Sequence, residues 1–524
     1  GTLKWDTEVD GLVLTAGYIL VTEQGSFQLG TRVRPMEKRA TIYITKGPHQ
    51  HHKLGYRFFG SLGEARVEVH GRKLERTWTL LAQTAKLGST QLFLKHDPDV
   101  MGWRPGDRIG VATTSRGEST RHTLRSIGPA TEWQLGVAGV VAGVERPEWH
   151  EAAANVIDGN TRTRWGSWCA PFCSGLDQWL ALTLEGPCRV SKVRLRFDSH
   201  RYAPKYELQV WRASGTDWET AARVEGAAGG WREVRVDADA VALRLFADYE
   251  AMKADRADAW AGLWLYEVEV FGVELWKPVP KVAHIDPPLA DEHWGGFREV
   301  EGYRFEMAAE VVNLERTVLI TGNHTDFEDT HQGIHTIMAG KGIMDVRYAR
   351  AEYCGQRDSM GRYCMHFHLG EQCSDCVFQG NAIVDSQQVG ITIHGTHRSL
   401  VDNNVLWDAR GAGIYVEDGN EMFNTISENV LICSSVAACT VNWLGRTGQF
   451  AGIYLIGMTN NLIGNHVAGY ENGIWTPGGF NGNGQGKAWR RVCPGHTPFG
   501  TIRGNVNHDC NRFGLYLDNQ YPRN

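Results

Sequence analysis

Two histidines and a glutamate occupy equivalent positions in three short segments of this chain. The segments are MHFH at 365–368, ITIH at 391–394 and IYVE at 414–417. Each alternates apolar and polar residues over four positions. Imidazole and carboxylate groups are ligands of zinc, and they also act as general acids and bases. The three segments therefore predict a site that binds a transition metal or transfers protons.

Short alternating strands must position these groups. Similar strands recur with Asn-rich turns between them, such as Val-Asp-Asn-Asn at 401–404, and this recurrence is typical of a parallel β-solenoid. Side chains of a strand alternate between its two faces. In-register stacking therefore predicts Phe367, Ile393 and Val416 in the coil interior.

The same register places His368, His394 and Glu417 in one outward column. Neighbouring strands lie about 4.8 Å apart, so these groups can meet, with His366 and Asp418 beside them. Together they are a plausible ligand set for zinc or another divalent metal. Such a metal lowers the pKa of water and promotes hydrolysis of a glycosidic or ester bond.

Two other interpretations of the column stay open. Without a metal, a histidine or carboxylate could act as a base on a uronic-acid sugar while Arg362 neutralises the sugar carboxylate, which is the chemistry of a lyase. Alternatively, the stacked polar residues only hydrogen-bond to one another and support the coil.

Several motifs in order resemble a known family. The run 349–432, with GRYCMHFHLG, ITIHGTH and IYVEDGNE, resembles the β-helix core of cell-migration-inducing hyaluronan-binding proteins and their fibrocystin-like relatives. The segment 78–115 resembles the eight-glycine domain that precedes this core. The similarity resumes at 285–289 and 317–320, and 511–515 resembles a later coil.

The sequence between segments 78–115 and 285–289 does not resemble the β-helix family. The segments 155–165, 178–182 and 265–272 resemble a discoidin domain, the type C module of coagulation factors, which is a β-sandwich of jelly-roll type. Insertions are tolerated at exposed loops whose ends lie close together. We therefore expect this module to interrupt a solenoid turn.

The resemblances together imply an all-β chain built on a right-handed parallel β-helix. We expect an eight-glycine domain at 1–144 that forms the first coils, an inserted discoidin-like β-sandwich at 145–273, and β-helix repeats at 274–524. Solenoids present long faces suited to extended polymers.

In discoidin-like domains a segment like Asp-Gly-Asn often wraps a calcium ion. The resemblance assigns this role to Asp158, Asn160, Thr163 and Glu267. Calcium takes 6–8 oxygen ligands, which such a loop can supply. The alternative is a turn closed by its own side chains without an ion.

The insertion also contains aromatic residues that could contact a sugar. Trp165, Trp168 and Trp218, with the loop 199–206, could form an aromatic platform with a polar rim. The alternative is that these tryptophans belong to the core of the domain.

Composition limits the partners. The chain has 524 residues and a formal net charge of −6, which excludes a general attraction to nucleic acid or anionic lipid. No apolar run approaches the roughly 18 residues of a membrane span. The first residue is not a natural start, so we expect a processed or trimmed piece, from which a targeting segment could have been lost. A polyanion would need a local basic patch, for which the candidates are Arg347, Arg350, Arg362 and Arg398.

The cysteines and one sequon are compatible with the extracellular setting that the family resemblance implies. Three pairs lie close in sequence, namely Cys169 with Cys173, Cys373 with Cys376 and Cys433 with Cys439. The extracellular setting of the family that the chain resembles implies disulfide bonds, although a zinc site at Cys373–Cys376 is an alternative. The Asn-His-Thr sequon at 323–325 predicts N-glycosylation.

These observations support two functional hypotheses. The first is a secreted or cell-surface protein that binds, and in its stronger form depolymerises, a polysaccharide of the hyaluronan type, with a glycoprotein as the other candidate partner. The second is a non-catalytic structural or adhesive component of an extracellular matrix, coat or filament, within a larger assembly. The clustered histidines favour the first hypothesis, and the lack of a defined pair of catalytic carboxylates favours the second.

Overall fold

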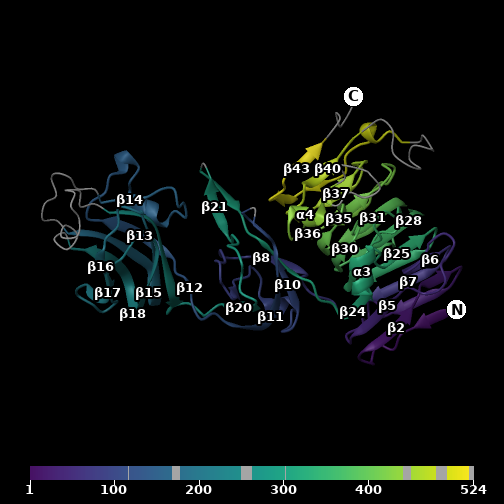
Figure 1. The fold of residues 1–524 in the computed structure, drawn as a ribbon, viewed down its shortest axis with the longest axis horizontal. Coiled ribbons are helices and arrows are strands. Elements are labelled where there is room, and N and C mark those ends of the chain that lie inside the picture. The colour runs from purple at the N-terminus through teal and green to yellow at the C-terminus, as the bar shows by residue number, and fades with distance from the viewer. Residues whose placement is uncertain are drawn as a thin grey trace. The chain divides into compact units, whose positions relative to one another are not determined.

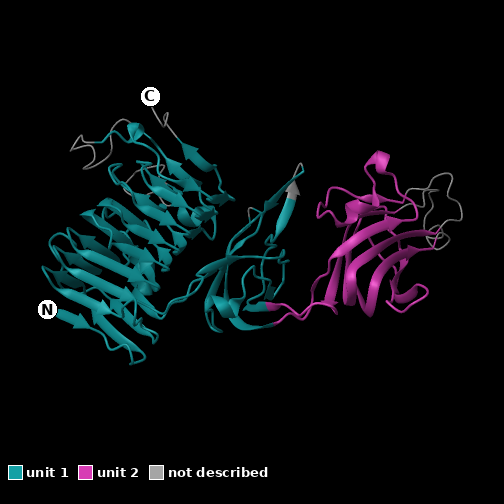
Figure 2. Ribbon diagram, turned by 180° about the vertical axis from the view of Figure 1, so that it is seen from behind, with its two compact units in different colours: residues 1–128, 282–524 teal, residues 129–281 magenta. Residues whose placement is uncertain are grey.

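The computed structural model describes two compact units. The described residues are 1–115, 117–167, 177–248, 263–300, 302–440, 450–478 and 492–517. One unit contains residues 1–128 and 282–524, and the other contains residues 129–281 (Figure 2). No helix in the described ranges is long and apolar enough to cross a membrane.

The first unit is built on a parallel β-helix. Three parallel sheets of nine strands each run along it, and successive coils add one strand to every sheet (Figure 1). The strands of the first sheet are β1 (Thr2–Lys4), β4 (Ser26–Leu29), β7 (Arg66–His70), β26 (Ile343–Arg347), β29 (Val377–Gln379), β32 (Leu400–Asp402), β35 (Thr425–Ser427), β38 (Asn461–Ile463) and β41 (Ile502–Arg503).

The two other sheets complete each coil. The strands of the second sheet are β2 (Leu12–Ala16), β5 (Ala40–Ile44), β24 (Val318–Gly322), β27 (Ala349–Cys354), β30 (Ala382–Ser386), β33 (Val405–Ala409), β36 (Val430–Ile432), β39 (His466–Ala468) and β42 (Val506–His508). The strands of the third sheet are β3 (Ile19–Thr22), β6 (Phe58–Leu62), β25 (His335–Ala339), β28 (Met365–Gln372), β31 (Ile391–His397), β34 (Ala412–Val416), β37 (Ala451–Leu455), β40 (Asn472–Thr476) and β43 (Phe513–Leu517).

The predicted register of the third sheet is confirmed. Phe367 on β28 pairs with Ile393 on β31, which pairs with Val416 on β34. All three side chains are fully buried in the coil interior. A slip by one residue would turn all three toward the outside, so the alternation of the strands fixes which residues face outward.

Asparagine side chains join successive coils inside the turns. The amide Nδ2 of Asn381, Asn404 and Asn429 each donates to the Oδ1 of the asparagine one coil further on, at 2.9–3.0 Å. The row continues through Asn465 to Asn505. Each amide therefore satisfies polar groups that would otherwise be buried without partners.

The β-helix is interrupted within its third coil. The chain leaves the first sheet after β7 and re-enters the second sheet at β24. The two ends meet, because the backbone N–H of Arg72 donates to Thr317 Oγ1 at 2.9 Å. The residues between them form a six-stranded antiparallel sheet, in the order β8 (Trp78–Leu80), β23 (Glu310–Asn313), β10 (Arg108–Val111), β11 (Thr120–Pro129), β20 (Lys281–Asp286) and β9 (Gln91–Leu92), and a hairpin of β21 (Phe297–Val300) and β22 (Tyr303–Glu306).

The antiparallel sheet covers the outer face of the second β-helix sheet. Val312 and Leu314 pack against Val405, Trp407 and other apolar side chains that point outward from the coils. At the end of this contact Glu310 forms ion pairs with His466, at 2.6 Å, and with His508, at 2.9 Å. The antiparallel sheet is therefore a part of the same compact unit.

The second unit is an eight-stranded β-sandwich of the discoidin-like type. Its strands are β12 (Trp133–Gln134), β13 (Val137–Ala142), β14 (Trp165–Gly166), β15 (Gln178–Phe197), β16 (Lys205–Trp211), β17 (Glu219–Glu225), β18 (Gly230–Ala247) and β19 (Trp264–Glu274). In the sequence it lies between β11 and β20, which are neighbours in the antiparallel sheet. The module thus interrupts this sheet and not a solenoid turn, because the coil is already interrupted by the antiparallel sheet itself.

The domain limits differ from those expected from the sequence. The sandwich unit runs over 129–281 and not 145–273, because β12 and β13 pair with β19 and β15. Residues 72–128 belong to the antiparallel sheet, so the first coils end at β7.

The described α-helices are short, namely α1 (Pro98–Met101), α3 (His324–Thr330) and α4 (Val436–Cys439), and the 3₁₀ helices are η1 (Pro147–Trp149), η2 (Ala153–Ile157) and η3 (Pro494–His496).

Three disulfides lie in the β-helix. Two of them, Cys373–Cys376 and Cys433–Cys439, are the expected pairs, so no zinc site forms at 373–376. The third, Cys354–Cys364, joins residues ten apart and was missed from the sequence. Cys169 and Cys173 lie outside the described residues.

We predict that the asparagine row is a main source of β-helix stability. Asn429→Ala removes two donors and an acceptor from a buried row and leaves its neighbours unsatisfied. Unfolding in urea should show a loss of about 2–4 kcal/mol. Asn511→Ala, which removes an exposed amide bonded to Glu471, should change stability by less than about 0.5 kcal/mol. Equal effects of the two substitutions would contradict the role of the row.

We also predict that stability falls as the pH rises through the neutral and alkaline range. Burial alone would lower the pKa of His508, but the charge of Glu310 and hydrogen bonds with Asp509 and Glu310 raise the pKa to about 10. The ion pairs therefore stabilise the fold fully below the unfolded pKa of about 6.5, and their contribution is lost as the pH approaches 10. The slope for one such group is at most about 1.4 kcal/mol per pH unit.

The measurement is the unfolding free energy between pH 6 and pH 10. His508→Gln should flatten the decline relative to the wild type, whereas His324→Gln, which removes an exposed imidazole on α3, should leave it unchanged. A wild-type decline that persists in full in His508→Gln would exclude this group as its cause.

Candidate functional site

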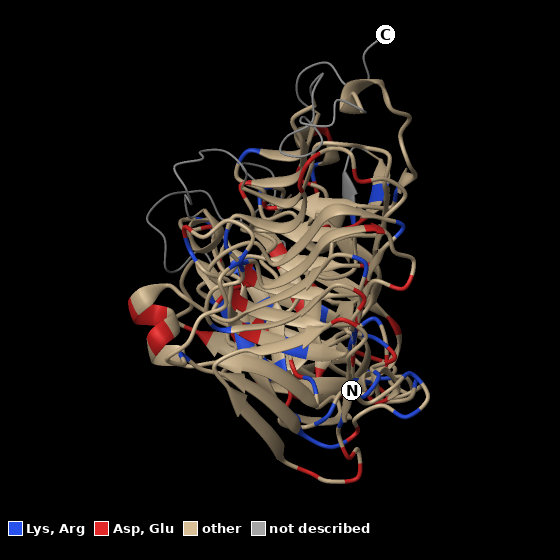
Figure 3. Cartoon of the chain, turned by 90° about the vertical axis from the view of Figure 1, so that its right-hand side faces the viewer, with Lys and Arg blue, Asp and Glu red and all other residues tan. Residues whose placement is uncertain are grey.

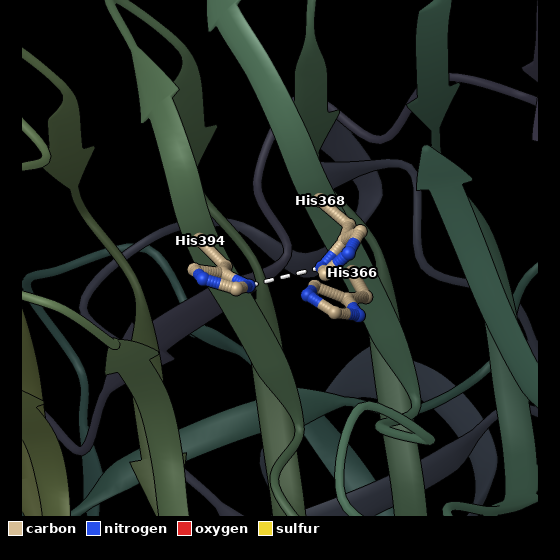
Figure 4. Close-up of side chains that lie close together, drawn as sticks. All are labelled: His366, His368 and His394. Carbon is tan, nitrogen blue, oxygen red and sulfur yellow. Dashed lines mark hydrogen bonds between the residues drawn. The ribbon is translucent and has the colours of Figure 1, made fainter. Parts of the chain in front are cut away.

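Two histidines of the outward column, His368 and His394, meet the neighbouring His366 on the third sheet. His366 and His368 come from β28, and His394 comes from the neighbouring strand β31 (Figure 4). One ring nitrogen of each lies within 4.8 Å of those of the other two. The alternation of β28 brings residues 366 and 368 to the same face, and the register brings His394 beside His368.

Hydrogen bonds fix the orientation of His394 within this cluster. Its Nδ1 lies 2.9 Å from His368 Nδ1, and its Nε2 lies 3.0 Å from Asp418 Oδ2. Glu417 Oε2 lies 3.7 Å from the same Nδ1. The carboxylate of Asp418 holds a proton on Nε2, so that the lone pair of Nδ1 faces the cluster when the ring is neutral.

His366 presents an unused nitrogen to the same point. Its side chain is fully buried, and its Nδ1 lies 3.1 Å from the carbonyl oxygen of Gly361 and donates to it. Its Nε2 forms no hydrogen bond with any residue that the structure describes. The backbone contact therefore selects the tautomer whose Nε2 lone pair faces His368 and His394.

The turn that carries the acidic residues is held by Glu421. Its carboxylate accepts hydrogen bonds from the backbone N–H groups of Gly395, Asp418 and Gly419. The side chain is fully buried. Sequence analysis missed this residue, although the Glu-Asp-Gly-Asn-Glu run is a visible signal of an acid-rich turn.

Burial keeps two of the imidazoles neutral. It lowers the pKa of His366 well below its usual value, and the nearby His368 and His394 act in the same direction. Burial also lowers the pKa of His368 to about 4, again with a contribution from His394. For His394 burial is outweighed by the hydrogen bond with Asp418 and by nearby carboxylates, which raise its pKa.

Glu417 is poised to exchange a proton near neutral pH. Burial raises the pKa of its carboxyl group to about 7, and the charges of Asp418 and Glu421 add to this, while His394 opposes it. Tyr363 donates a long hydrogen bond of 3.4 Å to Glu417 Oε1. The side chains of His394 and Glu417 retain 12% and 14% exposure, so both groups are mostly buried.

Arg362 does not join this cluster. Its guanidinium donates to Gln356 Oε1 at 2.9 Å and packs against Gly55. No hydrogen bond or ion pair links it to the histidines or to Glu417 among the described residues. The expected neutralisation of a sugar carboxylate by Arg362 at this site therefore has no support in the geometry, because the preceding loop directs the side chain toward an earlier coil.

Two of the four arginines proposed for a basic patch are paired with acidic residues. Arg347 pairs with Asp345, and Arg350 is buried and pairs with Glu315 and Glu352. Basic and acidic residues are interspersed along the coils (Figure 3). Carboxylates on the same strands, together with Glu315, thus neutralise these two arginines.

The cluster has the composition of a site for a borderline-soft divalent metal. Three imidazole nitrogens and a carboxylate oxygen lie close together, and outer hydrogen bonds orient two of the rings. Zinc prefers such ligands in four-coordinate geometry, and its histidine ligands usually donate the other ring N–H to a carboxylate or a carbonyl. The residues present therefore fit this type of ion.

The candidate calcium loop of the sandwich is closed by its own side chains. Asp158 Oδ1 accepts from Asn160 N and Oδ2 from Thr163 Oγ1, both at 2.7 Å. The structure thus brings together Asp158, Asn160 and Thr163, whose oxygens are exposed to solvent. Glu267 is buried on β19, two residues beyond Leu265, which pairs with Trp165.

The predicted aromatic platform of the sandwich does not form as expected. Trp165 is fully buried, and its Nε1 donates to the carbonyl oxygen of Val144 at 2.8 Å, so it is a core residue. Trp218 packs edge-on against Trp211 and lies under Arg244. Trp168 lies outside the described residues.

An arginine–tryptophan stack lies elsewhere on the sandwich. The guanidinium groups of Arg164 and Arg201 lie 3.6 Å and 4.6 Å from the ring centre of Trp264. Sequence analysis missed this stack, because its members come from three separate segments of the chain.

The fold and the cluster define a parallel β-helix protein with an inserted β-sandwich. Three family models match: a CEMIP β-helix at residues 331–515, a G8 domain at 1–82 and a NedA-like, galactose-binding domain at 155–245. The chain therefore combines the G8 domain and the CEMIP β-helix with a galactose-binding domain, as the sequence motifs indicated. The G8 model matches residues 1–82. It therefore overlaps only the start of segment 78–115, whose sequence had suggested an eight-glycine domain.

Known relatives share parts of this architecture. Human fibrocystin-L is 22% identical over 99% of this chain, which corresponds to 10% of the relative. Human cell surface hyaluronidase CEMIP2 is 27% identical over 41% of this chain and 18% of its own length. Protein rliB of Dictyostelium discoideum is 28% identical over 36% of the chain and 17% of its own length. The chain thus spans less than a fifth of each of these relatives.

Solved structures of two modules are similar to about a quarter of this chain. Chitosan-binding module 1 of a chitosanase/glucanase from Paenibacillus sp. IK-5 is 25% identical and covers 26% of this chain and 96% of its own, with a TM-score of 0.22. The family 32 module of Clostridium perfringens NanJ, solved with galactose, is 20% identical and covers 27% of this chain and 98% of its own, with a TM-score of 0.23.

Proposed function

We propose that this chain is part of a secreted or cell-surface protein that binds an extracellular polysaccharide of the hyaluronan type, and that its histidine cluster holds a divalent metal ion used in depolymerising it. One observation carries the proposal: three imidazoles offer nitrogens within 4.8 Å of one another, and Nε2 of the buried His366 has no partner among the described residues. A buried nitrogen without a partner is costly unless a ligand satisfies it.

The comparisons support the polysaccharide part of this proposal. One relative is named a cell surface hyaluronidase, and the inserted region matches a galactose-binding domain model. Disulfides in the coils are typical of an oxidising, extracellular compartment. The exposed sequon at Asn323, which caps α3, is compatible with a glycoprotein.

His366, His368 and His394 would hold the ion. Glu417 is the carboxylate beside Nδ1 of His394, at 3.7 Å. When bound, a zinc-like ion polarises water and lowers its pKa. Asp418 orients His394, and Gly361 orients His366. Glu417, whose pKa of about 7 lets it hold or release a proton near neutral pH, would serve as the general acid or base at a glycosidic oxygen.

Burial supports the second candidate, a non-catalytic structural or adhesive component. His366 is completely covered, and His394 and Glu417 are mostly covered. A closed set of ligands is typical of a structural metal, whereas a catalytic metal keeps a position open. Metal binding without cleavage of any polysaccharide would therefore select this candidate.

We predict that the purified full chain binds Zn²⁺ and that His394→Ala loses it. Removing one of three imidazole ligands should weaken binding by at least about 100-fold, and Asp418→Asn should weaken it by about 10- to 100-fold through the loss of the outer hydrogen bond. Titration calorimetry and metal analysis measure both effects. The same variants should lose cleavage of hyaluronan, chondroitin, pectin or alginate.

The matched control for this experiment is His324→Ala, which removes an exposed imidazole on α3. Circular dichroism should show that all variants are folded. If the wild type binds no divalent metal and cleaves none of the four polymers over a wide pH range, the metal centre and the enzymatic role are both rejected.

We propose further that the loop at 158–163 binds calcium as a structural ion. Its support is the gathering of hard oxygen donors from Asp158, Asn160 and Thr163 in one glycine-containing turn. Glu267 would contribute as the acidic residue that the discoidin resemblance assigns to such a site.

Calcium that binds only the native state should raise its stability, by about 2.7 kcal/mol at a concentration 100 times the Kd. We expect EGTA to lower the melting temperature of the full chain and Asp158→Ala to remove this sensitivity. Asp239→Ala, which breaks an exposed ion pair with Arg189, serves as the control. An unchanged melting curve in excess EGTA would show that the turn functions without an ion.

A further inference from the structure

Two arginines lie close together at the corner where the second sheet of the β-helix turns into the third. Arg357 lies in the turn after β27, and Arg410 directly follows β33, two coils further on. Gln387, in the coil between them, directly follows β30. None of these residues belongs to the histidine cluster or to the calcium loop.

Both guanidinium groups converge on one amide oxygen. Arg357 Nη2 donates to Gln387 Oε1 at 2.8 Å, and Arg410 Nη1 donates to the same oxygen. The side chain of Gln387 is buried, and its Nε2 donates to the carbonyl oxygen of Phe327 on α3 at 3.3 Å. The contact with α3 therefore orients the glutamine so that its oxygen faces the two arginines.

The two positive charges have no counter-ion in contact with them. Neither guanidinium forms an ion pair with any residue that the structure describes. Burial, and after it the charge of Arg410, lowers the pKa of Arg357, while the charges of Asp358 and Glu328 oppose this from a longer range. The amide oxygen of Gln387 accepts hydrogen bonds but carries no charge. Like charges held this close repel each other, at a cost that an anion in contact with both would offset.

Two nitrogens beside the pair are buried without partners among the described residues. They are Nε of Arg357 and Nδ1 of His331, the residue that follows α3. The backbone N–H of Arg357 donates to the carbonyl oxygen of His331 at 3.0 Å, so the two residues are neighbours. Burial and the charges of both arginines lower the pKa of His331. A buried nitrogen without a partner is costly unless a ligand satisfies it.

We propose that Arg357, Arg410 and His331 bind a tetrahedral oxyanion, namely a sulfate or phosphate group. Guanidinium groups recognise such anions through paired, charge-assisted hydrogen bonds. Polar groups from three side chains suit an anion with three or more free oxygens better than a carboxylate, which offers two. The site goes beyond the proposed metal centre and does not depend on it.

The test is calorimetric titration of the full chain with sodium sulfate, sodium phosphate and sodium acetate at constant ionic strength. We expect saturable binding of sulfate or phosphate and at least about tenfold weaker binding of acetate. Arg410→Gln should weaken binding by about tenfold or more, because a charge-assisted hydrogen bond is lost. Methyl sulfate and methyl phosphate identify the source of the group: they bind as well as the inorganic ions if the natural ligand carries the group as an ester, and not at all if it is a free ion.

Gln387→Glu separates anion binding from a purely structural role of the arginines. The new carboxylate has the size of the amide and would neutralise both guanidinium groups in place of the ligand. We therefore expect a higher melting temperature of the ligand-free chain and the loss of stabilisation by sulfate or phosphate. This variant also tests the site if Arg410→Gln fails to fold.

Two control variants test whether the anion binds at this corner. Arg39→Gln removes an exposed cation that is paired with Asp10, and it should leave anion binding unchanged. His394→Ala should leave anion binding unchanged as well, even if it abolishes metal binding. No saturable binding, equal affinity for acetate, undiminished binding in Gln387→Glu, or loss of binding in His394→Ala would each overturn the proposal.

Discussion

In-register parallel stacking of coils is the constraint on which the rest of this structure depends. Strands that pair residue for residue place equivalent side chains in columns about 4.8 Å apart. Inward columns form a continuous apolar core through Phe367, Ile393 and Val416. Turn columns become the asparagine row, whose amides bond from coil to coil. Outward columns determine which polar groups meet. The side chains of both candidate sites of the first unit are brought together in this way.

The third coil shows how much can be inserted without disturbing that stacking. The chain leaves and re-enters at points joined by the bond between Arg72 and Thr317, so strand pairing continues directly from β7 to β26. The antiparallel sheet inserted here is not an appendage, because it buries the outer apolar face of the second sheet. Where this cover ends, the ion pairs of Glu310 with His466 and His508 replace apolar contacts.

The buried histidines of the first unit lie in two different electrostatic settings. In the histidine cluster, burial keeps His366 and His368 neutral and leaves nitrogen lone pairs facing one point. Around Glu310, a buried carboxylate holds His508 as a cation, because opposite charges at about 3 Å outweigh the cost of desolvation. The first arrangement suits a metal ion, and the second suits an internal ion pair between the antiparallel sheet and the last coils.

The sequence by itself determined the β-helix, its register and the meeting of His368, His394 and Glu417, because alternation and repeat spacing are local properties that stacking converts directly into columns. It also indicated the disulfides between cysteines close in sequence. Only the tertiary structure decided where Arg362 points, that Trp165 is buried, and that Glu421 holds the acidic turn. The meeting of Arg357 and Arg410 at Gln387 was likewise invisible, because the three residues come from turns of different length in successive coils, and such contacts leave no periodic signal in the sequence.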